Sequence, residues 1–190
     1  MERTLVVLKP DAIEKGLIGE IVTRFEKVGL RIIAVKLLIV HKELVERHYP
    51  VDREELWVGI GNKTLDNYRD LDMDPKESLG TSDPKEIGKM VRVWLMDYLM
   101  KGPVLAMILE APHAVELVRK MAGHTLPLIA APGTIRGDYA YDSSYLANSN
   151  KRAIENLLHA SGTKEEAEYE IPLWFTAKEI HAYKRSADVI

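Results

Sequence analysis

The chain has 190 residues, of which 46% are hydrophobic and 29% charged, and its formal net charge is −3. This composition is ordinary for a globular protein with a buried core, and the length indicates one domain. Cysteine is absent, which excludes disulfides, thiolate nucleophiles and cysteine-bound zinc. The mixed charges create no overall positive field, and no run of about 18 apolar residues predicts a membrane span. We therefore expect a cytoplasmic protein that binds neither nucleic acid nor membrane.

The first third of the chain predicts two strands and two helices. Residues 4–8 form an apolar run followed closely by Pro10, which is typical of a buried strand. Apolar residues recur at helical spacing over residues 18–28, and Gly29 is suited to end that helix. Residues 31–40 are rich in β-branched residues and predict a second strand, and residues 42–49 predict a short helix.

The middle of the chain begins with a polar stretch. Residues 58–83 are punctuated by glycine and proline, and they predict an insertion or a long surface excursion. Asp83 and Pro84 are suited to begin a helix, which we expect to end before Gly102. Residues 104–111 predict a third strand and residues 112–123 a third main helix.

In the last third we expect a short strand near Tyr139. Thr163 and Glu166 form a capping-box pattern, which predicts that a helix begins just after Thr163. The order of the elements indicates an α/β or α+β layered domain.

Three basic residues are candidates for holding a phosphate group. Lys9 directly follows a predicted buried strand, Arg136 lies in the tight loop PGTIRGD, and Arg119 lies on the helix of residues 112–123. Arginine suits phosphate because its guanidinium forms two parallel hydrogen bonds. Each residue also has a purely structural interpretation: a solvated strand end for Lys9, an ion pair with Asp138 for Arg136, and a solvated helix face for Arg119. The chain contains neither GxxxxGK[ST] nor GxGxxG, which disfavours the common nucleotide-binding folds.

His159 is a candidate nucleophile, because it lies among small residues just before the predicted helix. The first N–H groups of that helix favour a nearby anion, and Glu170 is placed two turns along it to orient the imidazole. An oriented neutral imidazole can attack a phosphorus atom. The alternative is a histidine that is hydrogen-bonded in a loop.

Several ordered motifs together resemble the nucleoside diphosphate kinase family. They are ERTLVVLKPD, GLIGEIVTRFEKVGLRIIAVK, ERHY, GPVLAMILE, PGTIRGD and NLLHASGTKEEAEYEIPLWF. The resemblance leaves out residues 58–93 and 140–152. It therefore implies a single kinase-like domain, 1–190, with two insertions, which either reshape the base cleft or pack between subunits.

The resemblance implies a ferredoxin-like core, in which helices pack on a four-stranded antiparallel sheet. It also implies transfer of the γ-phosphate of a nucleoside triphosphate to a nucleoside diphosphate, by a ping-pong mechanism through a phosphohistidine. Mg²⁺ would be bound mainly through the nucleotide phosphates. Family members assemble as hexamers or tetramers built from dimers, so a homo-oligomer is implied.

Site residues follow from the resemblance position by position. His159 matches the nucleophile, Glu170 the carboxylate that orients it, and Ser161 the hydroxyl that supports this pair. Asn156 and Lys9 match the residues that meet the ribose 3′-hydroxyl, and Trp57 the aromatic residue that stacks on the base. The phosphate-holding set is matched by Lys9, Arg119, Thr125 and Arg136. The tyrosine beside the histidine is matched by Tyr49.

Three positions depart from the family pattern, and at the first Ala160 stands where a glycine is usual after the histidine. Gly162 stands where an aspartate is usual, so no protein ligand to the metal is implied, and Leu126 replaces a usual asparagine before Pro127. The competing hypothesis is a catalytically silent nucleotide-binding module with a regulatory or assembly role. Retention of His159 and Glu170 favours the enzyme, since a binding module is free to lose them.

Overall fold

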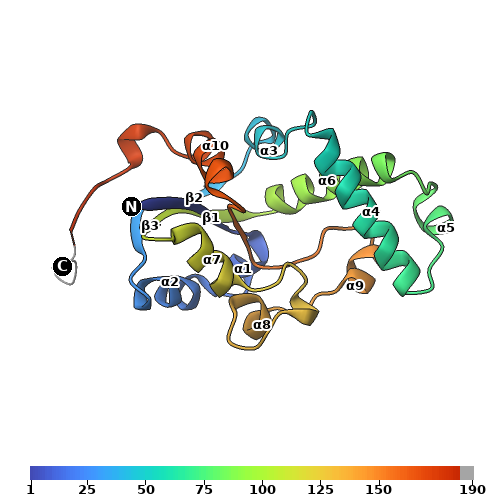
Figure 1. Ribbon diagram of the computed structural model, residues 1–190, viewed down its shortest axis with the longest axis horizontal. Helices are drawn as coiled ribbons and strands as arrows, with labels where there is room; N and C mark the ends of the chain where they lie inside the picture. Colours follow the sequence, from blue (N-terminus) through green and yellow to red (C-terminus); the bar gives the residue numbers. More distant parts are fainter. Residues whose placement is uncertain (185–190) are drawn as a thin grey trace.

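An antiparallel sheet forms the centre of the fold. The computed structural model describes residues 1–184, and its strands follow the order β2-β3-β1-β4 (Figure 1). The strands are β1 (Glu2–Leu8), β2 (Arg31–Ile39), β3 (Pro103–Ala111) and β4 (Leu158–Ala160). The predicted four-stranded antiparallel sheet is thus confirmed. The domain prediction extends to residue 190, and residues 185–190 lie outside the described part.

Helices cover both faces of this sheet (Figure 1). The α-helices are α1 (Pro10–Glu14), α2 (Ile18–Lys27), α3 (Lys42–His48), α4 (Glu54–Asp70), α5 (Pro75–Leu79), α6 (Pro84–Met100), α7 (Ala114–Ala122), α8 (Ile135–Tyr139), α9 (Ser144–Ser149) and α10 (Lys164–Trp174). Two 3₁₀ turns are η1 (Pro127–Ile129) and η2 (Ala177–Glu179). The predicted helices at 18–28, 42–49, 84–101 and 112–123 are confirmed within a few residues.

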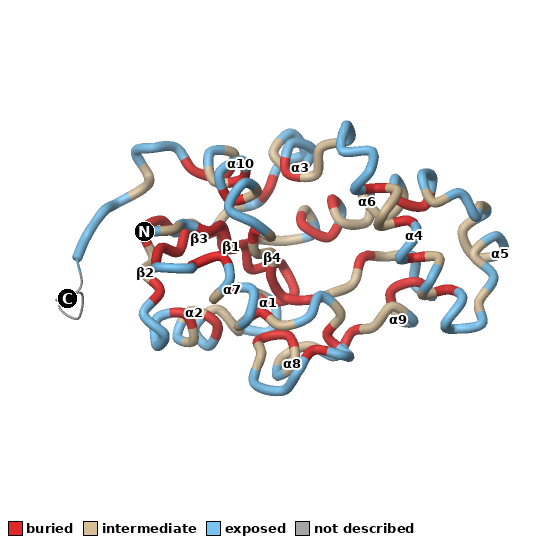
Figure 2. The backbone as a smooth tube through the Cα atoms, in the orientation of Figure 1, coloured by how far each residue is buried: buried red, intermediate tan, exposed pale blue. Residues whose placement is uncertain are grey.

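The apolar run of β1 is buried because both sides of the sheet are covered. Val6 and Leu8 join the core beneath α2 and α7, whereas Leu5 and Val7 join the core beneath α3, α6 and α10. Alternate side chains of a strand point to opposite faces, so a strand covered on both faces is apolar at every position. Figure 2 shows this buried centre.

The polar stretch after residue 58 is mostly helical, a structure that the sequence analysis did not predict. Helix α4 extends to Asp70 and packs beside α6 as a helical hairpin, with α5 at its tip (Figure 1). The buried residues of α4 recur at helical spacing, but two of them are small or polar, which weakened the apolar pattern; they are Trp57, Gly61, Thr64 and Tyr68.

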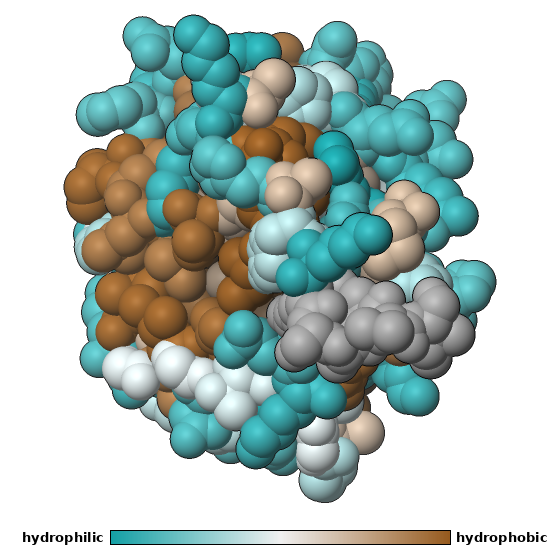
Figure 3. Space-filling view, turned by 90° about the vertical axis from the view of Figure 1, so that its left-hand side faces the viewer, coloured by the Kyte–Doolittle hydropathy of each residue, from teal (hydrophilic) through white to brown (hydrophobic). Residues whose placement is uncertain are grey.

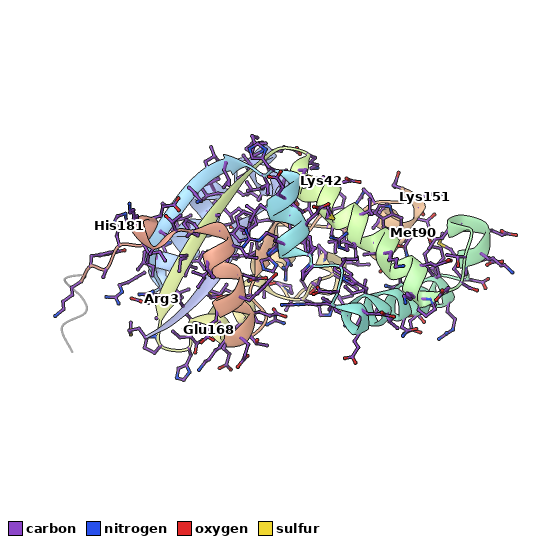
Figure 4. All side chains as sticks on the ribbon, turned by 90° about the horizontal axis from the view of Figure 1, so that it is seen from above. Arg3, Lys42, Met90, Lys151, Glu168 and His181 are labelled. Atoms are coloured by element: carbon purple, nitrogen blue, oxygen red, sulfur yellow. The ribbon has the colours of Figure 1, made fainter. Side chains whose placement is uncertain are left out.

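Two glycines allow the helices of this hairpin to approach each other closely. A Cβ atom at Gly61 would lie 1.9 Å from the carbonyl oxygen of Pro84, and one at Gly88 would lie 2.0 Å from that of Trp57. The backbones therefore touch where larger residues would hold them apart. The hairpin extends away from the sheet: Figure 4 shows Met90 near its end, far from His181.

The expected strand near Tyr139 is wrong, because this segment forms helix α8. The Thr134 side chain accepts a hydrogen bond from the Gly137 backbone N–H, which caps and begins a helix instead. The fourth strand is β4, whose three residues pair with residues 6–8 of β1.

The edge of the sheet at β2 carries exposed apolar side chains. Val35, Leu37 and Ile39 are all more than half exposed, and a hydrophobic patch is visible on this end of the molecule (Figure 3). The C-terminal segment lies against the other part of the same strand, where the His181 N–H donates to the Ile33 carbonyl at 2.8 Å. Lys36 also pairs with Glu179 of η2 at 2.7 Å.

No helix within residues 1–184 is long and apolar enough to cross a membrane.

Candidate active site

Strand β4 brings His159 to the same end of the sheet as Lys9. His159 pairs with Val7 in the ladder, and Lys9 follows β1 directly. Ser161 continues the pairing, since its backbone N–H donates to the Leu5 carbonyl at 3.1 Å and its Oγ accepts from the Leu5 N–H at 3.2 Å. His159 is therefore held by a strand rather than by a mobile loop.

Helix α10 carries Glu170 to the imidazole. The Thr163 side chain caps this helix by accepting from the Glu166 N–H at 3.2 Å, as predicted. The Glu166 carboxylate does not return to Thr163; it accepts from the Gly162 N–H at 2.7 Å. The buried face of α10 consists of Ala167, Glu170 and Trp174. Helical spacing thus turns Glu170 toward β4 two turns from the cap.

His159, Glu170 and Ser161 form a connected set. Nε2 of His159 lies 2.8 Å from Oε1 of Glu170, and the Ser161 hydroxyl donates to Oε2 of Glu170 at 2.7 Å. The carboxylate oxygen lies off the axis of a linear hydrogen bond to Nε2, so the histidine contact is chiefly electrostatic. Burial alone would raise the pKa of Glu170, but His159 and Ser161 outweigh it and lower that pKa to about 2. Glu170 is therefore an anion at neutral pH, and Nδ1 is the ring nitrogen that it leaves available.

His48 is a further member of this site, which the sequence analysis missed. Its ring lies edge-on to that of His159 with centroids 4.5 Å apart, and Nδ1 accepts from the Trp174 indole N–H at 3.3 Å. Burial lowers the pKa of His48 to about 3, so this ring is neutral at pH 7. In the sequence, His48 follows the apolar Val45 by three residues, a spacing that puts both on one face of the predicted helix. Both are buried on α3 in the structure.

His48, His159 and Glu170 offer ligand atoms within 4.8 Å of one another. Two imidazoles and one carboxylate suit zinc or copper better than Mg²⁺, which prefers oxygen ligands. The chemistry of this set therefore gives no protein site for Mg²⁺.

Arg136 holds the backbone around the site together. Its guanidinium donates to the carbonyl oxygens of Asn156 at 3.0 Å, Gly123 at 2.8 Å and Leu158 at 2.8 Å. Burial and the nearby Arg119 lower the pKa of Arg136 to about 10, which still leaves it charged at pH 7. The alternative ion pair with Asp138 is wrong.

Asp138 pairs instead with Arg24 at 2.6 Å. Arg119 itself is exposed on α7. Its guanidinium would lie 3.5 Å from a Cβ atom at Gly162, which puts a charged group beside the segment that follows His159.

Lys9 is buried beside Asn156. Its Nζ donates to the Asn156 Oδ1 at 2.7 Å and lies 4.7 Å above the centre of the Tyr98 ring. Burial and the charge of Arg136 lower the pKa of Lys9 to about 7. The other end of the Asn156 amide donates to the Thr125 carbonyl at 3.0 Å, so Asn156 links Lys9 to Thr125.

Tyr49 and Trp57 form a chain of aromatic contacts with His48. The Tyr49 ring packs against His48, with centroids 4.7 Å apart, and burial raises the pKa of its phenol. Trp57 is only 3% exposed, and its indole N–H donates to the Pro50 carbonyl at 2.9 Å. Its ring lies against that of Tyr49, with centroids 6.3 Å apart, and its low exposure opposes the prediction that a nucleotide base stacks on it.

Comparison with known proteins identifies the family. The family model described as nucleoside diphosphate kinase matches residues 2–58 and 85–180. The chain belongs to the nucleoside diphosphate kinase family. The residues left unmatched inside this span, 59–84, comprise most of α4 and all of α5.

Individual members of the family are similar along almost their whole length. The nucleoside diphosphate kinase of Pyrobaculum aerophilum is 46% identical over 95% of this chain and 98% of its own. The crystal structure of the NDP kinase from that organism has a TM-score of 0.93, at 45% identity over 95% of this chain and 99% of that one. A transition-state mimic of the Borrelia burgdorferi enzyme, with bound vanadate and ADP, has a TM-score of 0.76, at 36% identity over 97% and 93% of the two chains.

Proposed function

We propose that this protein transfers the γ-phosphate of a nucleoside triphosphate to a nucleoside diphosphate through phospho-His159. Family membership supports the reaction, and the contact between Nε2 of His159 and Glu170 carries the assignment of the nucleophile. The similar Borrelia structure binds vanadate and ADP, and a similar Halobacterium salinarum structure binds CDP. ADP and CDP are both nucleoside diphosphates, the acceptor class of this proposal.

The chemical step uses the nitrogen that Glu170 leaves available. The lone pair of Nδ1 attacks the γ-phosphorus, the bond from that phosphorus to the bridging oxygen breaks, and the diphosphate leaves with the electron pair. An incoming diphosphate then attacks the phosphohistidine with a terminal oxygen, and the N–P bond breaks. The buried anion Glu170 stabilises the positive charge that develops on the imidazole, and Ser161 fixes the carboxylate.

The remaining predicted residues have positioning and charge-balancing roles in this proposal. Phosphoryl transfer depends on alignment and electrostatic stabilisation more than on covalent chemistry. Arg119, Arg136 and Thr125 hold the phosphates, Lys9 and Asn156 meet the ribose 3′-hydroxyl and the γ-phosphate, and Tyr49 borders the histidine pair. Mg²⁺ is carried on the nucleotide phosphates, where it neutralises charge.

Assembly and location complete the proposal. The exposed apolar side chains of β2 support a homo-oligomer, hexameric or tetrameric, because such a row is costly in contact with water. A single domain with insertions near 58–93 and 140–152 and a cytoplasmic location are retained from the sequence.

The test is to incubate the protein with Mg²⁺ and a nucleoside triphosphate labelled at the γ-phosphate. We expect a label on the wild type that is stable in base and lost in acid, and no label on His159→Ala. His41→Ala is the matched control, since His41 is an exposed histidine at the start of α3, and it should label normally.

Addition of a different nucleoside diphosphate should then release the label as the corresponding triphosphate. A label that persists on His159→Ala would contradict the assignment of the nucleophile. Nucleotide binding without any label on the wild type would favour the catalytically silent module.

A further inference from the structure

A strained turn lies immediately before β4, the strand that carries His159. Leu157 is completely buried and has a φ of 69°, a left-handed conformation that leucine rarely adopts. The Leu158 N–H donates to the Asn156 carbonyl at 2.8 Å, which closes a γ-turn around Leu157. Such a conformation persists only where surrounding contacts determine it.

Two side chains from distant parts of the chain satisfy the N–H groups of this turn. The Tyr98 hydroxyl of α6 accepts from the Asn156 N–H at 3.0 Å. The Asp11 carboxylate of α1 accepts from the Leu157 N–H at 3.1 Å. Both bonds are buried, so water cannot replace either acceptor without a rearrangement.

The turn is connected to both halves of the proposed active site. In one direction it leads through Leu158 to His159, and in the other it begins with Asn156, which holds Lys9. Tyr98 supports the second connection as well, because its ring lies beneath the Lys9 ammonium at 4.7 Å. Leu157 is thus the residue between Asn156 and β4, and its carbonyl also accepts from the Lys9 backbone N–H at 2.8 Å, so the shape of this turn affects where His159 lies relative to Lys9 and Asn156.

We propose that Asp11 and Tyr98 are positioning residues for phosphoryl transfer. They hold the turn at Leu157 and thereby set the place of His159 relative to Lys9 and Asn156. The proposal rests on His159 being the nucleophile. Neither residue belongs to the predicted site, and the bonds they accept lie on the peptide backbone that precedes the nucleophile.

The experiment measures single-turnover labelling of His159 at several concentrations of γ-labelled triphosphate. Tyr98→Phe removes one oxygen and keeps the ring beneath Lys9, so we expect the rate constant at saturating nucleotide to fall about tenfold, as for about 1.4 kcal/mol. The apparent Kd should stay within about twofold, since the phosphate-holding residues are unchanged. Asp11→Asn replaces the charged acceptor of the other bond with a weaker, neutral amide oxygen, so we expect a smaller fall in the rate constant and an unchanged Kd.

Tyr68→Phe is the matched control. Tyr68 is completely buried on α4, away from the turn, and the substitution also removes one phenol oxygen. We expect any loss of thermal stability in this control to leave the labelling rate constant at the wild-type value. A rate that falls in Tyr98→Phe and not in Tyr68→Phe separates positioning from general destabilisation.

Two results would overturn the proposal while the wild type still labels on His159. One is a wild-type rate constant in both Tyr98→Phe and Asp11→Asn; the other is a loss that saturating nucleotide fully restores. If the wild type carries no label at all, or if the His159→Ala variant still becomes labelled, the proposed function fails instead, and this proposal fails with it.

Discussion

The region around His159 and the α4–α6 hairpin are stabilised in different ways. Around His159, buried polar side chains from distant segments bind backbone groups, as when Arg136 binds three carbonyls. In the hairpin, Gly61 and Gly88 allow two backbones to touch, and ion pairs such as Lys85 with Glu54 remain at the surface. The stability of the first region therefore depends on hydrogen-bonding geometry, and that of the second depends on the small volume of the residues between its helices.

The largest expected effect is in the first region. Arg136→Lys keeps a positive charge, but its N–H donors all lie on one nitrogen and cannot reach the carbonyls that three separate guanidinium nitrogens bind, so buried acceptors lose their partners. We expect a loss of roughly 3–5 kcal/mol in the free energy of unfolding and a collapse of His159 labelling. Denaturant unfolding and the labelling assay check both. A variant with wild-type stability would show that the backbone around the site does not need this guanidinium.

An intermediate effect is expected in the hairpin. Gly88→Ala puts a methyl group 2.0 Å from the Trp57 carbonyl, so the helices must separate, with a loss of about 1–3 kcal/mol in unfolding free energy. Gly59→Ala, on the same hairpin with open space around it, should instead gain up to about 1 kcal/mol. Labelling of His159 should be retained in both variants. Equal stability of the two would contradict the role given to close helix packing.

The third prediction concerns pH and Lys9. The pKa of Lys9 is about 7 in the folded protein and 10.5 for a freely solvated lysine, so the unfolded chain binds more protons between these values. The cost of burying a charged Lys9 is therefore full below pH 7 and decreases as pH rises toward 10.5. We expect the unfolding free energy of the wild type, relative to Lys9→Met, to rise by roughly 1–3 kcal/mol from about pH 6 to about pH 10. A difference independent of pH would contradict this burial cost.

The sequence was sufficient where one periodic pattern decides the structure. The run at residues 4–8, the cap at Asp83 and the cap at Thr163 are local signals, and each element that they predict is present. Helix α4 was missed because its contact face contains Gly61 and Thr64, which mark no apolar stripe. Strand β4 has only three residues, and its existence depends on pairing with β1 across more than half of the chain.

The site was predictable in its motifs and not in its supporting contacts. His159, Glu170 and Ser161 come together as expected, because a strand followed by a capped helix brings them together locally. The position of His48 in the site depends on α3 packing against α10, and no sequence motif predicts this contact between helices. Trp57 likewise belongs to the buried face of α4, a helix that the polar sequence did not predict.

The carboxylate that is usual in the family at position 162, where this chain has glycine, has a counterpart in space. The Glu166 carboxylate occupies the position beside Gly162, where a Cβ atom would lie 2.5 Å from Oε2. A negative charge is therefore present next to this backbone, although the residue that carries it is four positions further along the chain.

The C-terminal segment limits how the sheet can grow. A free strand edge is a template for pairing with other chains, and uncontrolled pairing leads to aggregation. Because the His181 N–H occupies the Ile33 carbonyl, the edge of β2 is capped near its start, and within residues 1–184 no further backbone pairs with it toward Ile39. Edge-to-edge growth is thereby confined to one half of the strand, and shortening the chain before η2 would release the other half to self-association.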